Sequence, residues 1–400
     1  MKAGWERKPL GDVCERVTVG HVGITSPYYR DSGVLFLRTQ NVGENGLALD
    51  DLKYVTSDFH SAQKKSAVRS GDILMSRVIT HTVHCALVPE GFPEANCANV
   101  VLVRPSKELG GEYLTYYIRS SDGQKHLLDR KTGSAQLVVN TKVVQTWPIP
   151  VPPIPEQQRI VAILDEAFAG IAKARAAAEQ NRQNARALFE SHLQSVFNHA
   201  WQTGTVVSLS DIATDITDGD HMPPPKSETG VPFITIGNIQ KDTRQIDFSD
   251  TFKVPREYFD GLKANKKPQT GDVLYTVTGS FGIPVLIEGD EEFCFQRHIG
   301  IVRPKTDILS NWLYYLLMSP QVFKQANDGA TGTAQKTISL KLLRGFQVPR
   351  VTPEQQLADV AKLDALTVET QRLEALYQRK LEALDELKQS LLHQAFSGQL

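Results

Sequence analysis

The fold is decided by the stretch Pro155-Glu156-Gln157-Gln158, which is followed by Leu164-Asp165. The same letters recur as Pro353-Glu354-Gln355-Gln356 and Leu363-Asp364, at offsets of 198 and 199 residues. Gly133-Ser134-Ala135-Gln136 likewise matches Gly332-Thr333-Ala334-Gln335, and Phe197 matches Phe396, both at 199. A repeat of this length is too large for one unit of a solenoid. It predicts two similar domains, each followed by a similar helix.

Composition narrows the class of protein. The 400 residues suffice for two or three domains, and a hydrophobic share of 41% is ordinary for a soluble globular chain. There is no run of about 18 apolar residues, residues 1–8 do not resemble a signal peptide, and the four cysteines show no CxxC or disulfide pattern. We therefore expect a cytoplasmic protein. The net charge of −1 argues against DNA binding by electrostatics alone, but it permits base reading by a few placed side chains.

Both copies show strands and short helices in the same order, which predicts an α+β (mixed α/β) fold. In the first copy, residues 33–38, 71–75 and 100–105 are typical of buried strands, and residues 112–118 of a short amphipathic helix. The matching segments of the second copy are 230–234, 271–275, 300–304 and 312–316.

Each copy continues into a long helix, at about residues 157–197 and 356–396. Because the chain leaves along one helix and returns along the other, we expect an antiparallel two-helix coiled coil with a domain at each end and approximate two-fold symmetry. Apolar or small residues recur along both helices at coiled-coil spacing. In the second helix they are Leu363, Leu366, Leu373, Tyr377, Leu384, Leu387 and Leu391.

The two helix starts differ in their capping residues. Thr352 is a suitable N-cap, and Gln355 is placed to complete a capping box with it. The first helix has Ile154 at the matching position before Pro155, so we expect it to be capped less well.

Together these motifs resemble the specificity subunit of type I DNA restriction–modification enzymes, over nearly the whole chain. The resemblance is carried by the repeated Pro-Glu-Gln-Gln and Gly-[Ser/Thr]-Ala-Gln motifs, the turns at 71–74 and 271–274, and residues 391–400. It implies two target recognition domains joined by spacer helices, with the domains at 1–150 and 200–350 and the helices at 151–199 and 351–400.

The resemblance also implies a function without catalysis. Each domain would read one half of a split DNA sequence, and because the two domains differ at most positions, the target would be bipartite and asymmetric. The helices would set the gap and dock methyltransferase subunits. The implied partners are double-stranded DNA, two methyltransferase subunits and a restriction or translocase subunit, with no membrane. S-adenosylmethionine, ATP and Mg²⁺ would reside on those subunits, and this chain would hold no cofactor.

Candidate DNA contacts are loop side chains that can pair with base edges or phosphates. Each has an alternative interpretation as a solvated loop residue, and for the two glutamines of the repeated motif a hydrogen bond within a turn is an equal alternative. In the first domain the candidates are Arg77, His81, Asn99, Gln136 and Lys142. In the second they are His221, Thr278, Ser280, Arg297, His298, Gln335 and Lys336.

Apolar positions on the long helices are the candidates for docking partner subunits. They are Ile160, Leu164, Ile171, Leu188, Leu363, Leu373, Leu384 and Leu391.

The sequence lacks the usual catalytic motifs. It has no P-loop, no GxGxxG after a strand, no Asn/Asp-Pro-Pro-aromatic run and no nucleophile elbow. The loop at 218–221 is acidic and ends in histidine, which favours a stiff turn over a metal site. The set His81, His84, Cys85 and Cys97 fits no usual zinc spacing, so we expect no metal. A nuclease hidden in one domain and a protein-binding scaffold remain the alternative functions.

Overall fold

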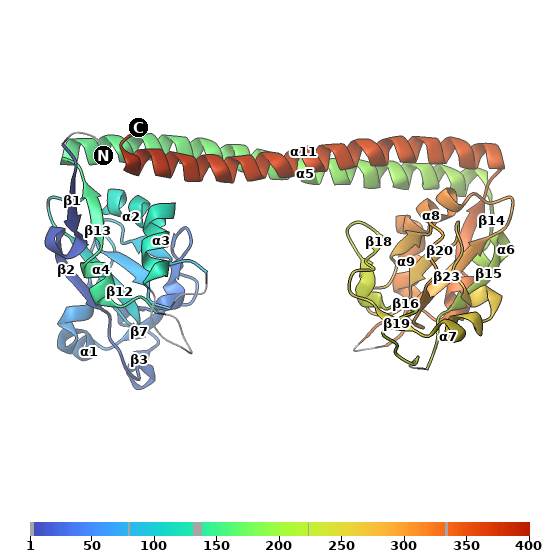
Figure 1. Cartoon of the computed structure of the whole chain (residues 1–400), viewed down its shortest axis with the longest axis horizontal. Helices are drawn as coiled ribbons and strands as arrows, with labels where there is room; N and C mark the ends of the chain where they lie inside the picture. Colours follow the sequence, from blue (N-terminus) through green and yellow to red (C-terminus); the bar gives the residue numbers. More distant parts are fainter. Residues whose placement is uncertain (1–3, 79–80, 131–137, 223, 333–334) are drawn as a thin grey trace. The chain divides into compact units, whose positions relative to one another are not determined.

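The computed structural model describes residues 4–78, 81–130, 138–222, 224–332 and 335–400. The chain forms two compact units, the first made of Met1–Glu179 and Gln378–Leu400 and the second of Gln180–Tyr377. Each unit combines strands with helices (Figure 1), which confirms the predicted α+β class with two similar domains. Among the described residues, no helix combines the length and the apolar character that crossing a membrane requires.

The first unit is built on two sheets. An antiparallel sheet has the order β10-β9-β12-β2, formed by β2 (Cys14–Val19), β9 (Ile73–Ser76), β10 (Cys85–Leu87) and β12 (Val100–Pro105). The second sheet has the order β3-β7-β4-β11-β8, formed by β3 (Tyr29–Arg30), β4 (Val34–Leu37), β7 (Lys53–Val55), β8 (Ala67–Val68) and β11 (Ala95–Cys97). A small hairpin and short helices complete it, namely β5 (Val42–Gly43), β6 (Gly46–Leu47), α1 (Ser57–Ala62), α2 (Gly111–Arg119), α3 (Ser121–Asp129) and α4 (Thr141–Gln145).

The second unit repeats this plan. Its antiparallel sheet has the order β15-β23-β20-β21, formed by β15 (Ala213–Asp218), β20 (Val273–Thr276), β21 (Pro284–Leu286) and β23 (Ile299–Pro304). A smaller sheet, β19-β16-β22, contains β16 (Val231–Ile234), β19 (Phe252–Val254) and β22 (Cys294–Phe295). The hairpin and helices are β17 (Ile239–Gln240), β18 (Gln245–Ile246), α6 (Leu209–Ile212), α7 (Arg256–Asp260), α8 (Ser310–Met318), α9 (Pro320–Gly329) and α10 (Leu340–Arg344).

Two-stranded ribbons lead into the long helices α5 (Ile154–Thr203) and α11 (Pro353–Ser397). They are β1 (Glu6–Pro9) with β13 (Pro148–Val151) and β14 (Thr205–Ser208) with β24 (Gln347–Arg350). Within each unit the two long helices pack antiparallel. In the first unit Arg175 pairs with Asp385, with the nitrogen and oxygen 2.5 Å apart, and in the second Arg186 pairs with Glu374.

The two long helices begin at positions that differ by one residue from the alignment of the Pro-Glu-Gln-Gln motifs. Helix α5 begins at Ile154 and α11 at Pro353, an offset of 199 where the Pro-Glu-Gln-Gln letters match at 198. The Oγ1 of Thr352 accepts a hydrogen bond from the backbone N–H of Gln355 at 3.3 Å, so Thr352 is the N-cap as predicted. The predicted capping box is wrong, because the side chain of Gln355 donates to Asp359. Pro153 holds the place of Thr352 in the first helix.

The apolar positions of α11 follow the heptad frame only in part. Leu363 is buried and Leu373, Tyr377 and Leu384 are half-buried, but Leu387 is 46% exposed. Leu381 and Leu392 are buried outside the predicted frame. The reason is that each half of α11 must face both α5 and a globular domain, so its buried stripe is not the narrow line of a two-helix coiled coil.

Each unit closes its core over the start of one long helix and the end of the other. In the first unit, Leu164 of α5 and Phe396 of α11 lie in one core with Tyr113 and Trp147. In the second, Leu363 of α11 and Phe197 of α5 lie in one core with Trp312. The repeated motifs at 164 and 396 therefore mark where helix meets domain.

Candidate nucleic-acid interface

The candidate interface lies where the two central strands of each antiparallel sheet end. In the first unit Ser76 at the end of β9 pairs with Val100 at the start of β12, so the loop beginning at Arg77 and the turn containing Asn99 leave the sheet side by side. In the second unit Thr276 pairs with Ile299, and the N–H of Val277 donates to the carbonyl of His298 at 2.9 Å.

A third segment joins this edge in both units. The N–H of Val139 donates to the carbonyl of Arg77 at 2.9 Å, and the N–H of Ile338 to the carbonyl of Val277 at 2.7 Å. The N–H of Gly279 also donates to the carbonyl of Lys336 at 3.2 Å. The loop after the central strand therefore lies against the segment that precedes α4 or α10. Gln136, which belongs to this segment in the first unit, is outside the described residues.

A fourth loop follows β2 or β15 and meets the turn before β12 or β23. The N–H of Asn99 donates to the carbonyl of His21 at 3.2 Å, and the N–H of Arg297 to the carbonyl of Asp220 at 3.1 Å. The structure thus brings most of the predicted contact residues to one edge of the sheet in each unit. Lys142 follows at a short distance, in the first turn of α4.

Exposure separates the candidates. Arg77 and His298 are half-buried. Thr278 is only 6% exposed because its backbone pairs with Thr337 beneath the loop, so its side chain does not present itself to a ligand. The exposed candidates are His81, Asn99, Lys142, His221, Ser280, Arg297, Gln335 and Lys336.

The charged loop at 218–221 is a hydrogen-bonded turn. The ring Nε2 of His221 lies 2.9 Å from a carboxylate oxygen of Asp218. Asp220 accepts a hydrogen bond from the hydroxyl of Tyr258 on α7, and Lys266 donates to the carbonyl of Gly219 at 3.1 Å. Sequence reasoning missed Tyr258 and Lys266, because nothing in the local pattern connects residues 258 and 266 to this loop.

Titration states follow from burial and neighbouring charge. Burial lowers the pKa of His298, and Arg297 lowers it further. His298 is therefore neutral at pH 7, with one ring nitrogen that donates and one that accepts. A neutral ring can pair with a donor or an acceptor on a base edge, whereas a protonated ring would favour phosphate.

The two cysteines considered as zinc ligands together with His81 and His84 lie apart in the fold. Cys85 is in β10 and Cys97 in β11, which belong to different sheets. Both are buried, and burial raises the pKa of Cys85 to about 11, which disfavours the thiolate that a metal binds. Across the described ranges, no group of three or more His, Cys, Asp or Glu side chains is arranged to hold a metal ion.

The predicted docking positions fall into three classes. Ile160, Leu164 and Leu363 are buried in the cores of their own units, so they are not available to a partner. Leu188 is 50% exposed. The half-buried positions are Ile171, Leu373, Leu384 and Leu391. Four other apolar residues of α11 are exposed and lie outside the predicted list, namely Leu357, Val368, Leu376 and Leu387.

Comparison with known proteins identifies the family. The family described as "Type I restriction modification DNA specificity domain" matches residues 2–178 and 200–383. The specificity subunit of the type I restriction enzyme EcoKI from Escherichia coli (strain K12) is 22% identical over 436 residues, covering 100% of this chain and 90% of that one. The EcoBI specificity subunit of Escherichia coli is 20% identical, with 71% of this chain and 65% of that subunit covered.

Two solved structures share the fold. The HsdS subunit from Thermoanaerobacter tengcongensis has a TM-score of 0.60 at 21% identity, covering 100% of this chain and 98% of that one. A chain from a structure on complex assembly and conformational transition of the type I R-M system has a TM-score of 0.76 at 20% identity, covering 100% and 99%. Because the family model matches far more than half of its residues, the chain belongs to the non-catalytic DNA specificity subunits of type I restriction–modification enzymes.

Proposed function

We propose that each unit reads one half of a bipartite, asymmetric DNA target. The observation that supports this most is that the same sheet edge carries different side chains in the two units. In the first unit it presents His81 and Asn99, and in the second Ser280, Arg297 and Lys336. One framework with two sets of donors and acceptors suits two different base sequences. In this proposal residues 1–150 and 200–350 are the recognition domains.

The long helices, within the predicted spacers 151–199 and 351–400, set the gap between the half-sites. Helix α5 has 50 residues, which corresponds to about 75 Å. That is roughly two turns of duplex DNA at about 34 Å per turn. A continuous helix of this length suits a spacer, because hydrogen bonds within the helix hold its length fixed.

The same helices dock the other subunits of the complex, which we infer to be two methyltransferase subunits and a restriction or translocase subunit. Support comes from the exposed apolar side chains that recur along the two helices, since burying each of them against a partner is favourable. They are Leu188 on α5 and Leu357, Val368, Leu376 and Leu387 on α11. S-adenosylmethionine, ATP and Mg²⁺ belong to those subunits in this proposal, the target is double-stranded DNA, and the complex acts in the cytoplasm.

The test lengthens both helices together. Arg175 faces Asp385, so an insertion between Ala176 and Ala177 lies opposite one between Ala383 and Leu384. Four residues in each add about 6 Å of helix, which is roughly two base pairs at 3.4 Å each. Methylated bases are mapped across the genome with the wild-type and the lengthened chain. We expect both half-sites to be kept and the gap to widen. An unchanged gap refutes the spacer role, and a four-residue replacement without insertion is the control.

A further inference from the structure

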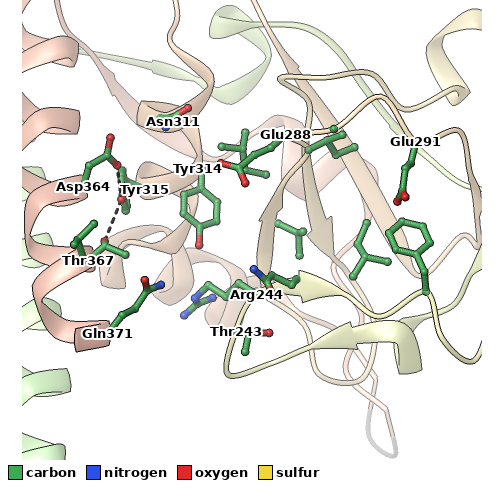
Figure 2. Close-up of a pocket in the computed structure, with 18 of the residues that line it drawn as sticks. Thr243, Arg244, Glu288, Glu291, Asn311, Tyr314, Tyr315, Asp364, Thr367 and Gln371 are labelled. Carbon is green, nitrogen blue, oxygen red and sulfur yellow. Dashed lines mark hydrogen bonds between the residues drawn. The ribbon is translucent and has the colours of Figure 1, made fainter. Parts of the chain in front are cut away.

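The second unit carries a groove that the proposed function does not use. Two hollows, of about 550 and about 710 Å³, adjoin between the β17–β18 hairpin on one side and α8 and α11 on the other. Figure 2 shows the first of them, with the hairpin facing the helices. The residues that line both hollows are Thr243, Arg244, Tyr314, Tyr315, Thr367 and Gln371.

Arg244 closes the hairpin turn in a conformation that glycine would adopt more easily. Its φ is 54°, and within the described ranges Asn99 is the only other non-glycine residue with a positive φ. In the shorter hairpin of the first unit, the residue with positive φ is Gly46, at 137°, which the strand pairs align with Gln245, the residue after Arg244. An arginine where glycine fits without strain indicates that its side chain is needed.

Arg244 is half-buried, and its guanidinium extends into the hollow toward Tyr314 and Gln371 (Figure 2). Among the described residues, neither a hydrogen bond nor an ion pair engages it. The positive charge of Arg244 acts on Tyr314 in the wall of the groove. Burial raises the pKa of the Tyr314 phenol, and Arg244 lowers it. A guanidinium has five N–H donors, so this one offers a carboxylate or a phosphate a partly desolvated binding site.

The charges around the groove favour a single carboxylate over the phosphates of a DNA strand. The charged residues that line the first hollow besides Arg244 are Glu288, Glu291 and Asp364, whereas the second hollow has Arg186 and Lys241 together with Glu190, Asp242 and Glu374. A DNA strand, with a phosphate about every 3.4 Å, would bring several negative charges against these carboxylates. A single protein carboxylate can reach Arg244 without meeting them.

The second hollow is lined by apolar rings. Phe281 and Phe323 stack with their centroids 5.9 Å apart, and Phe323 is 45% exposed. Met318 and Leu193 complete this side. Such a surface accepts an aromatic or large aliphatic side chain. Phe281 directly follows Ser280, so an occupant also touches the loop that carries a candidate DNA contact.

We propose that this groove binds a segment of a partner subunit in which a carboxylate lies beside an aromatic or large aliphatic side chain. The carboxylate binds Arg244, and the apolar side chain enters the hollow beside Phe281 and Phe323. This inference rests on the proposed function, because the partner is a subunit of the same complex.

The test measures assembly of the full chain with purified methyltransferase subunits of the same restriction–modification system. Arg244→Glu reverses the charge, and Arg244→Gly removes it while easing the backbone. We expect both to weaken assembly about tenfold or more, as for a lost charge-assisted hydrogen bond. The unfolding midpoint of Arg244→Gly should equal or exceed that of the wild type. Arg297→Glu, on the candidate DNA edge, is the matched charge reversal and should leave assembly unchanged.

A cross-linker at Thr243 then identifies the acidic segment of the partner, and changing its carboxylate to arginine should restore assembly with Arg244→Glu. Unchanged assembly of both Arg244 variants overturns the inference. Unchanged assembly with weakened DNA binding also overturns it, because Arg244 would then contact phosphate. If the wild-type chain itself does not assemble, the docking role fails and this inference with it.

Discussion

The two units use the same contacts where the domains meet the helices and different contacts at the sheet edge. Gln157 and Gln356 each accept a backbone N–H at 2.7 Å, from Gly110 and Leu309. Each also donates to a carbonyl in the loop before α2 or α8, that of Glu108 or Asp307. Tyr116 donates to Asp165, as Tyr315 does to Asp364. The difference teaches that the framework tolerates little change, because it seats a domain on a helix, whereas the loops that project from it are free to diverge.

The largest effect should come from the buried ion pair that both units share. In the first unit Arg104 contacts Asp72 through two hydrogen bonds of 2.7 Å, and the Asp72 side chain is fully buried. Asp72→Ala leaves a buried, unpaired guanidinium, which should cost the first unit about 3 to 5 kcal/mol. Hydrogen exchange read by mass spectrometry reports each unit separately.

The matched variant sharpens the comparison. Asp272→Ala unpairs Arg303, whose side chain is 19% exposed against 10% for Arg104. Water reaches that guanidinium more readily, so the second unit should lose less. Equal losses, or a loss spread over both units, would contradict a local framework. Asp31→Asn, at an exposed carboxylate, is the control.

A smaller loss is expected at the helix starts. Gln157 is 1% exposed, and its side chain bonds Gly110, Glu108 and Pro152. Gln157→Leu leaves these backbone groups buried without partners, at about 2 to 3 kcal/mol. Gln356→Leu should cost the second unit the same, since Gln356 makes the corresponding three bonds. Unfolding midpoints in urea measure both, and a clear inequality would show that the two helix starts are not equivalent.

A change in one loop should affect DNA binding by one unit and leave the other unit unchanged. Tyr258→Phe removes the hydroxyl that bonds Asp220, next to Arg297. The loss is about 1 kcal/mol, or roughly fivefold in binding. The loss should appear with duplexes that keep the half-site proposed for the second unit and vanish with duplexes in which that half-site is altered. Competition between duplexes altered in either half measures this, and a loss at both half-sites would contradict the division of labour.

The smallest effect concerns the strained turn of the first unit. Asn99 has φ 54°, which asparagine tolerates better than alanine. Asn99→Ala should cost about 1 kcal/mol, and Asn99→Gly should be close to neutral. Both remove the carboxamide, so both should weaken DNA binding alike if that group reads a base. Binding kept by the glycine variant alone would mean that only the backbone turn matters.

Much of the fold could be predicted because the residues that repeat in the sequence make the same contacts in both units. Asp165 and Asp364 repeat since each holds a tyrosine of the preceding domain. The strand predicted at residues 100–105 is β12, with those bounds. Arg77 lies in the loop after its strand, as expected, whereas its nearness to Asn99 comes from the antiparallel pairing of β9 with β12, which sets the end of one strand beside the start of the other.

The rest depends on contacts that have no local pattern. The Pro-Glu-Gln-Gln letters align Gln157 with Gln355, but the hydrogen bonds align it with Gln356. Tyr258 lies 38 residues after its partner Asp220. The exposure of Leu387 depends on which side of α11 faces the domain, and the heptad spacing alone does not specify that.

The discontinuity of the first unit bears on how the chain is synthesised. The second unit is one continuous stretch, Gln180–Tyr377, whereas the core of the first includes Leu392 and Phe396. At about 5 to 20 residues per second, the ribosome needs on the order of 10 to 40 s to pass from residue 179 to residue 392. The first unit, although made first, therefore waits through that interval with part of its core open, while the second completes itself. The two units therefore complete their cores in the reverse of their order in the sequence.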